Sequence, residues 1–380
     1  MNDINNNKDE QKNRSTFAEK FANARLNSFP EKRVSWKELN QKKKEYKKYK
    51  QERLSKKFNK PQEKQIQSEE DVSLKVDEYS TISIAVPGTI LDICQTRELK
   101  AYVVGQIARA ASIFKVNEII VYNEKNIENV EDEEEKMKLS KEGRGSALMI
   151  KILQYLECPQ YLRKFFFPMH SDLHYVGLLN PLDSPHHLRA DETSRFREGI
   201  TVNMPVGSGK GSYVYVGLKK KVVIDKLLKP NTRVTIMLDP DNPNKKRLRG
   251  KAVSPVTPLK LENCYWGYQV RFAPSLNSVI SRCPFKGGYD VTIGTSDAGQ
   301  NYKEVSFSKY KHLLIVFGGV KGIESCLEGD ETIAATDPKD IFNYYLNTCP
   351  SQGSRTIRTE EAILITLATL SDKFSRHEST

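Results

Sequence analysis

The chain has 380 residues, 38% of them hydrophobic and 28% charged, which allows two or three domains with ample cores. The longest apolar runs, such as Leu313–Phe317 and Ala362–Leu367, are far shorter than the roughly 18–20 residues that cross a bilayer. The six cysteines are scattered without a CxxC pair, and the opening MNDINNNKDEQKN is polar throughout. These features exclude a disulfide miniprotein and argue against a zinc ribbon or a signal peptide. We expect a soluble intracellular protein with no membrane or metal partner.

The positive charge is concentrated in an N-terminal arm, residues 1–75. Residues 1–66 hold 19 Lys+Arg and 9 Asp+Glu, so they account for +10 of the net charge of +12. Such an arm is typical of polyanion binding through counterion release, although a solvated tail for solubility or targeting has the same composition. Residues 36–58 are rich in helix formers and contain no Gly or Pro, which predicts a lone basic helix.

Residues 76–195 have the pattern of an α/β domain. Apolar β-branched runs separated by an amphipathic stretch predict a strand–helix–strand unit, and hence a parallel sheet covered by helices. The expected elements are a strand at Thr81–Gly88, a helix at Thr96–Phe114, a strand at Glu118–Asn123, an acidic loop at Glu124–Lys141 and a helix at Ser146–Leu156.

Residues 196–280 change to short alternating strands separated by Gly, Pro and Asn turns. The segments GITVNMPVG, GSYVYVGL, KKKVVIDK, RVTIMLD, KRLRGKAVS and YWGYQVRFA predict a small barrel of five or six strands, for which an OB-fold is the best match. Cations alternate with aromatic residues here, as in a single-stranded RNA groove, although aromatic residues of a barrel core give the same pattern. The RNA-binding candidates are Tyr213, Tyr215, Lys219, Lys220, Lys221, Lys245, Lys246, Arg247 and Arg249, with Tyr265, Trp266 and Tyr268 as further stacking faces.

The α/β pattern returns in residues 281–380, so the barrel is predicted to interrupt one α/β domain. Strands are expected within Tyr289–Ser296, His312–Gly319 and Ile341–Thr348, and a final helix at Thr359–Leu370 with Thr359 as its N-cap.

Three glycine-marked segments remain after familiar sites are dismissed. GSGKGS lacks the first P-loop glycine and lies between strands, and HSDLH lacks the glutamate of a zinc protease. The remaining segments are GQIARAASIF, FGGVKGIE and NTCPSQGSRTIRTEEA. The last two follow predicted strands, and ligands of open α/β sheets bind beyond the carboxyl ends of strands. Each segment alone is also compatible with an ordinary strand-to-helix turn.

At these motifs the chain resembles the SPOUT superfamily of RNA methyltransferases, and in particular the eukaryotic and archaeal family with an OB-like insert. The resemblance runs from about Ser80 to Leu370 and is carried by TISIAVPGTILD, LDSPHHLR, YDVTIGTS, FGGVKGIE and NTCPSQGSRTIRTEEAIL. It implies a trefoil knot, bound S-adenosylmethionine and a homodimer. The implied cofactor contacts are Gly318, Gly319, Asn347, Thr348, Gln352, Gly353, Ser354, Thr356 and Ile357.

The resemblance favours methylation of ribosomal RNA at uridine N3, in the large subunit, and a nucleolar location. Candidates for stabilising the uridine anion and gripping phosphate are Arg109, Arg355 and Arg358, because guanidinium stays charged and forks onto oxygens. Glu360 is a candidate to orient an arginine or accept a proton, although a helix-start carboxylate fits equally. His187 and Arg189, in LDSPHHLR, are further RNA-binding candidates, and His187 is also a candidate base or a structural histidine.

Three alternatives stay open at this point. Ribose 2′-O-methylation uses much the same parts, and a plain single-strand binder needs only the barrel. A nucleolar or spindle-associated RNA scaffold with little catalysis is favoured by Asp297-Ala298-Gly299, where relatives often have Glu-Arg-Gly.

Overall fold

The computed structural model describes residues 79–124, 141–204, 206, 211–239, 248–330, 332–333 and 335–373. The helix predicted at residues 36–58 and most of the predicted acidic loop lie outside these ranges. Among the described helices, none combines the length and the apolarity needed to cross a membrane.

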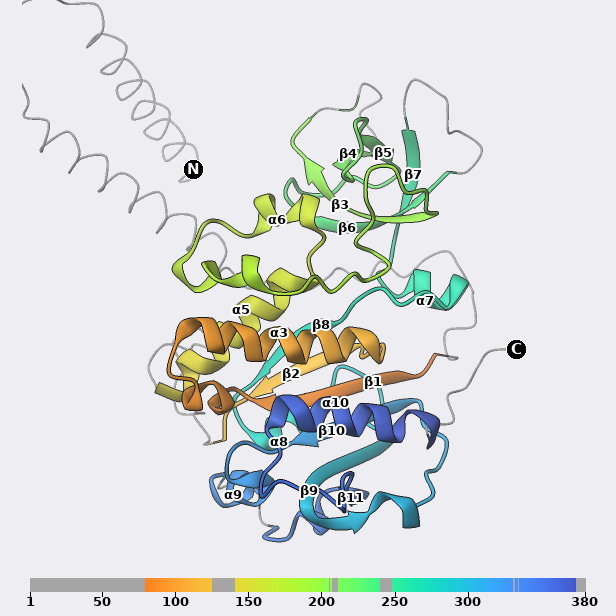
Figure 1. Cartoon of the computed structure of the whole chain (residues 1–380). Coiled ribbons are helices and arrows are strands. Elements are labelled where there is room, and N and C mark those ends of the chain that lie inside the picture. The colour runs from red at the N-terminus through yellow and green to blue at the C-terminus, as the bar shows by residue number, and fades with distance from the viewer. Residues whose placement is uncertain are drawn as a thin grey trace, which may run out of the picture. The chain divides into compact units, whose positions relative to one another are not determined.

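The predicted parallel sheet is confirmed. In the described residues it contains six strands in the order β11-β9-β10-β1-β2-β8, and every neighbouring pair is parallel (Figure 1). The strands are β1 (Thr81–Pro87), β2 (Glu118–Tyr122), β8 (Gln269–Ala273), β9 (Val291–Asn301), β10 (His312–Phe317) and β11 (Tyr344–Asn347). The apolar runs at β1, β2 and β10 are buried along their whole length, which is why they could be read from sequence.

Helices cover both faces of the sheet. One core joins the β1 side chains Ile82, Ile84 and Val86 to α3 (Arg97–Ile113), α5 (Lys141–Glu157) and α10 (Thr359–Leu370), and α10 packs against α3. The other core joins Ala85 to α8 (Leu276–Ser281) and α9 (Gly322–Glu328). Alternate residues of β1 therefore serve opposite cores.

Short helices complete the described structure. Three of them follow α5, namely α6 (Gln160–Phe166), η2 (Ser171–Leu173) and η3 (Val176–Leu178). The others are η1 (Gly88–Ile93), α7 (Thr257–Glu262), η4 (Tyr302–Glu304), η5 (Pro338–Asp340) and η6 (Ser371–Lys373).

The predicted barrel is also confirmed, with five strands that close in the order β3-β4-β5-β7-β6. They are β3 (Phe196–Val202), β4 (Ser212–Tyr215), β5 (Val222–Ile224), β6 (Arg233–Leu238) and β7 (Leu248–Val253), around a core that includes Val214, Val222 and Ile236.

Two local predictions are wrong. The segment YWGYQVRFA does not supply a barrel strand, because its residues Gln269–Ala273 form β8 and extend the parallel sheet beside β2. The barrel is already closed by the β3–β6 and β6–β7 pairs. Thr359 is the first residue of α10 and not its N-cap, which is Arg358.

Candidate active site at the carboxyl edge of the sheet

Hydrogen bonds join β11 to β9, and the start of α10 to the turn after β10. The Asn347 side-chain amide, at the end of β11, donates to the Asp297 carbonyl in β9 at 2.8 Å. The Thr359 hydroxyl, at the start of α10, donates to the Gly318 carbonyl after β10 at 3.0 Å. The structure therefore brings the turns predicted as FGGVKGIE and NTCPSQGSRTIRTEEA to one edge of the sheet.

The turn after β10 requires glycine. A Cβ on Gly318 would lie 2.5 Å from the backbone of Gly322 and Ile323, and one on Gly319 would lie 1.9 Å from Glu124 Oε1. The same Gly319 position is 3.3 Å from the Thr89 hydroxyl, which is buried and makes no hydrogen bond within the described residues. Both glycines are therefore required by close contacts within the chain, and the Thr89 hydroxyl is the group at this turn that a ligand could still satisfy.

The loop after β11 is held by its own side chains. The Gln352 side-chain amide donates to the carbonyls of Ser354 and Arg355 at 3.1 and 3.4 Å, and the Ser354 hydroxyl donates to the Thr356 carbonyl at 2.8 Å. The Thr348 and Thr366 hydroxyls, 2.9 Å apart, join the start of the loop to α10. Nothing lies within 4 Å of a Cβ placed on Gly353, so the tip of this braced loop has open space beside it.

Three of the four predicted catalytic residues lie on this loop and the first turn of α10. Arg355 and Arg358 are exposed, and the Arg358 guanidinium is 3.9 Å from the Glu360 carboxylate. The Arg358 backbone N–H donates to the Glu361 carboxylate at 3.0 Å, which fixes the helix start. The edge thus presents two arginines to solvent beside a mostly buried carboxylate.

Arg109 lies elsewhere in the same chain. It is in the last part of α3, about 18 Å along the helix axis from Arg97 at the helix start, near the carboxyl end of β1. Its guanidinium donates to the carbonyls of Leu182 at 2.6 Å and Pro181 at 3.3 Å. Within one chain this side chain fixes the 181–182 segment on α3.

Sequence reasoning missed several polar residues at the edge. Thr89 follows β1 and Glu124 follows β2, and the strand order places both beside the β10 turn. Glu324 in α9 accepts hydrogen bonds from the hydroxyls of Ser296 and Tyr345. Burial and the Glu324 hydrogen bond raise the pKa of Tyr345, so its hydroxyl stays protonated. In the sequence, Thr89 and Glu124 are distinguished only by being polar residues shortly after a predicted strand.

The RNA-binding candidates are spread over the barrel and its junction with α5. Arg189 is exposed, and so are Lys219, Lys220, Lys221 and Arg249, whereas Tyr213 and Tyr215 are half-buried on the outer side of β4. Lys245, Lys246 and Arg247 lie outside the described residues. Two of the additional stacking candidates cannot stack, because Tyr265 and Tyr268 are 5% and 4% exposed and donate to the Val116 and Leu153 carbonyls.

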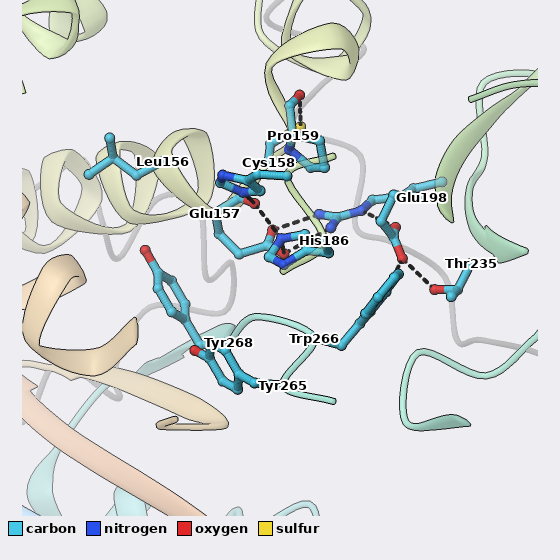
Figure 2. A network of polar contacts seen from close by, with 12 residues as sticks. Leu156, Glu157, Cys158, Pro159, His186, Glu198, Thr235, Tyr265, Trp266 and Tyr268 are labelled. Atoms are coloured by element: carbon cyan, nitrogen blue, oxygen red, sulfur yellow. Dashed lines mark hydrogen bonds and ion pairs between the residues drawn. The ribbon is translucent and has the colours of Figure 1, made fainter. Parts of the chain in front are cut away.

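His187 belongs to a buried polar network where the barrel meets α5. Its Nε2 lies 2.7 Å from the Glu157 carbonyl, and burial lowers its pKa to about 4. The ring is therefore neutral at physiological pH and donates to the main chain. Figure 2 shows the centre of this network, where His186 meets Glu157 while Trp266 and Thr235 meet Glu198.

In the part of the chain that the structure describes, no three His, Cys, Asp or Glu side chains come together in a way that could hold a metal ion. The site offers backbone, hydroxyls, carboxylates and guanidinium groups.

Comparison with known proteins decides the family. Residues 81–370 match the model of a family described as "Putative RNA methyltransferase". The chain belongs to this family. It is 47% identical over 353 residues to a 28S rRNA (uridine-N(3))-methyltransferase of Drosophila melanogaster, covering 89% of this chain and 73% of that one. Identity to the proteins of the same name is 49% in Homo sapiens, over 81% and 83% of the two chains, and 50% in Mus musculus, over 76% of each.

The family match confirms the predicted resemblance to RNA methyltransferases and the prediction of a methyltransferase enzyme. It covers both parts of the sheet and the barrel between them. It also includes the glycine-lined edge, by which we mean the β10 turn with Gly318 and Gly319, its neighbours Thr89 and Glu124, and the segment 347–360.

Proposed function

We propose that this methyltransferase transfers a methyl group to N3 of a uridine in large-subunit ribosomal RNA. One observation carries the proposal: relatives named 28S rRNA (uridine-N(3))-methyltransferase are 47–50% identical to this chain over at least three quarters of its length. Neither ribose methylation nor a scaffold without catalysis is favoured by these relatives.

The methyl donor in this proposal is S-adenosylmethionine, whose sulfonium supplies an activated methyl group. The residues fit such a ligand, since Gly353 borders open space and the Thr89 hydroxyl beside Gly319 is buried with no hydrogen-bond partner among the described residues. The residues that would hold it are Gly318, Gly319, Asn347, Thr348 and the loop residues Gln352, Gly353, Ser354, Thr356 and Ile357.

The chain's own chemical task is to make the uridine imide nucleophilic. That nitrogen must lose its proton, so cations that stabilise the resulting anion raise the rate. Arg355 and Arg358 are exposed at the edge and can face a base there, and Glu360 can orient Arg358. Arg109 is too far along α3 to join them in the same chain, so its role in catalysis requires a second copy.

A homodimer is therefore part of the proposal. It is supported by large apolar side chains exposed on η1, α3 and α10, where Ile93, Leu99, Tyr102 and Leu364 are 57%, 50%, 55% and 45% exposed. Covering them with the same face of a second copy would bury apolar surface near the site. Sedimentation of Tyr102→Glu should show a monomer where the unaltered chain is a dimer, and an unaltered chain that sediments as a monomer would refute this part.

Two finer features of the fold are proposed with the family. The return of α10 to the face of α3, together with the strand order β11-β9-β10-β1-β2, supports a SPOUT-type trefoil knot. The parallel β5–β7 pair within the closed barrel supports an OB-type barrel. A nucleolar location follows from the proposed ribosomal substrate and is tested by imaging the tagged chain.

Mass spectrometry of nucleosides from ribosomal RNA tests the proposal directly. RNA from cells lacking the protein should lose one N3-methyluridine and regain it when the purified chain and S-adenosylmethionine are added. Gain of a 2′-O-methyl nucleoside instead would select the ribose alternative. No change in any nucleoside would favour the scaffold, and Ala298, which stands after Gly294-Thr295-Ser296 where relatives often have arginine, would then explain the missing activity.

A further inference from the structure

An exposed aromatic cluster joins α6 to the outer side of the barrel. The rings of Phe165 in α6 and Tyr215 in β4 have centroids 5.5 Å apart and are tilted by 58°. The Lys164 ammonium lies 5.0 Å from the Phe165 centroid and 5.5 Å from that of Tyr215. Phe165 remains 40% exposed, so part of its ring is open to solvent.

The alternation of β4 explains why Tyr215 is available there. Val214 points into the barrel core and is fully buried, so Tyr213 and Tyr215 point outward and are half-buried. Beneath Tyr215 lies Tyr161, whose ring is 6.3 Å away at 78° and whose hydroxyl donates to the Glu198 carbonyl of β3 at 2.8 Å. The contact with Tyr161 therefore fixes the position of the Tyr215 ring.

Contacts on the other side hold α6 in place. The Arg163 guanidinium donates to the carbonyls of Cys158 at 2.9 Å and Leu156 at 3.2 Å, at the end of α5. From the barrel, Arg233 donates to the Glu157 and Glu198 carboxylates. Because only two residues separate α6 from α5, these contacts keep Phe165 beside Tyr215, and the two rings form one preorganised surface.

Positive charge lies close to the cluster. The turn after β4 passes over Tyr161, since a Cβ on Gly217 would lie 2.7 Å from the ring. Exposed Lys219, Lys220 and Lys221 follow directly in this turn, and Lys164 flanks both rings. Aromatic faces surrounded by lysines are complementary to unpaired nucleotides, whose bases stack while their phosphates meet the cations.

We infer that Phe165 and Tyr215 form a stacking site for an unpaired base of the RNA, separate from the edge where the methyl group is transferred. The inference rests on the proposed function only in taking RNA as the substrate. The two rings stack on the π face of a flanking base. Because every base has such a face, the site accepts any base, and it adds affinity without determining which uridine is methylated.

Binding of a fluorescein-labelled single-stranded oligouridine to the full chain, followed by anisotropy, tests the site. Phe165→Ala and Phe165→Leu should each weaken binding about 10-fold, because stacking contributes about 1–3 kcal/mol per base and leucine offers no π face. Tyr215→Ala should do the same. Leu227→Ala is the matched control, since Leu227 is 78% exposed on the barrel and lies outside the cluster, and its affinity should stay unchanged.

An oligomer of the same length with abasic positions separates stacking from charge. The unaltered chain and the three variants should bind it equally, because it offers phosphates without bases. Equal binding of oligouridine by all variants, or an equal loss for the abasic oligomer, would overturn the stacking site. Neither result depends on methylation, so loss of this inference and absence of N3-methyluridine in the nucleoside assay are separate outcomes.

Discussion

Arg233 in β6 donates two hydrogen bonds to the carboxylate of Glu157, the last residue of α5, at 2.6 and 2.8 Å. Its Nε also donates to Glu198 in β3 at 2.8 Å, so one guanidinium joins a carboxylate of the sheet part to one of the barrel. Glu198 receives further hydrogen bonds from Thr235 and Trp266 (Figure 2). Burial raises the pKa of both carboxyl groups, but Arg233 outweighs it and holds both below their ordinary values. The two carboxylates are therefore charged and paired at neutral pH.

Loss of this guanidinium should destabilise the fold. Arg233→Ala leaves two buried carboxylates without their guanidinium partner, which should lower the free energy of unfolding by about 2–3 kcal/mol. The loss is moderate because Arg233 is partly exposed, so water already screens the pair in part. Arg233→Lys should cost less, because an ammonium keeps the charge but cannot bond both Glu157 oxygens in the plane of a fork. Urea denaturation measures both changes.

Arg195 provides the control for that experiment. It pairs with Glu262 at 3.4 Å, with the two side chains 49% and 37% exposed, so Arg195→Ala should change the free energy of unfolding by less than about 0.5 kcal/mol. If Arg233→Ala is no more destabilising than Arg195→Ala, the junction does not depend on the buried pair.

His187 should make stability depend on pH between about 6.5 and 4. Its folded-state pKa, lowered to about 4 by burial, lies below that of the unfolded chain. The unfolded chain therefore binds the proton first as the pH falls, and stability that is full above the unfolded pKa is lost on the way to pH 4. Going from pH 7 to pH 5 should cost about 1–2 kcal/mol through this group.

His187→Gln should remove that part of the pH dependence. An amide can replace the ring N–H as donor to the Glu157 carbonyl, and it does not titrate. The ring faces His186, Glu157 and Arg163, all of which remain in the variant. The difference in unfolding free energy between the two chains should therefore shrink as pH falls from 7 to 5. A constant difference would show that His187 does not titrate in this range.

Local sequence patterns predicted individual strands, but they did not predict which strands pair with one another. The strands at β1, β2 and β10 are largely apolar runs, and such runs are typical of strands buried on both faces. In β8 the apolar Val270 and Phe272 alternate with Gln269 and Arg271, which is also the pattern of a barrel strand. Only its partner β2 decides the sheet to which it belongs.

In the candidate site, too, local motifs could be predicted from the sequence and long-range neighbours could not. Gly318 and Gly319 could be identified because adjacent glycines after an apolar run mark a close approach of the backbone. Glu124 and Thr89 could not, since they join the site through the order of the strands alone. Family resemblance places Arg109 with Arg355, but the length of α3 separates the two residues in one chain.

Gly319→Val should abolish cofactor binding. The new side chain would collide with the Glu124 carboxylate, 1.9 Å from its Cβ, and crowd the Thr89 hydroxyl at 3.3 Å, so both groups would have to move. Calorimetry with S-adenosylmethionine should show at least a 100-fold loss of affinity, while circular dichroism shows the helical content retained. Gly177→Ala is the control, because nothing lies within 4 Å of a Cβ at that position. Unchanged affinity in Gly319→Val would place the donor elsewhere.

Deletion of residues 1–66 should weaken RNA binding and flatten its salt dependence. The segment holds 19 Lys+Arg against 9 Asp+Glu, and each phosphate contact that is lost lowers the slope of log affinity against log salt by about 0.7 for single strands. Affinity for S-adenosylmethionine should not change, because the glycine-lined edge lies within residues 89–360. Anisotropy with oligouridine at a series of salt concentrations measures the slope. A slope equal to that of the full chain would mean that the arm contacts no RNA and serves targeting or solubility.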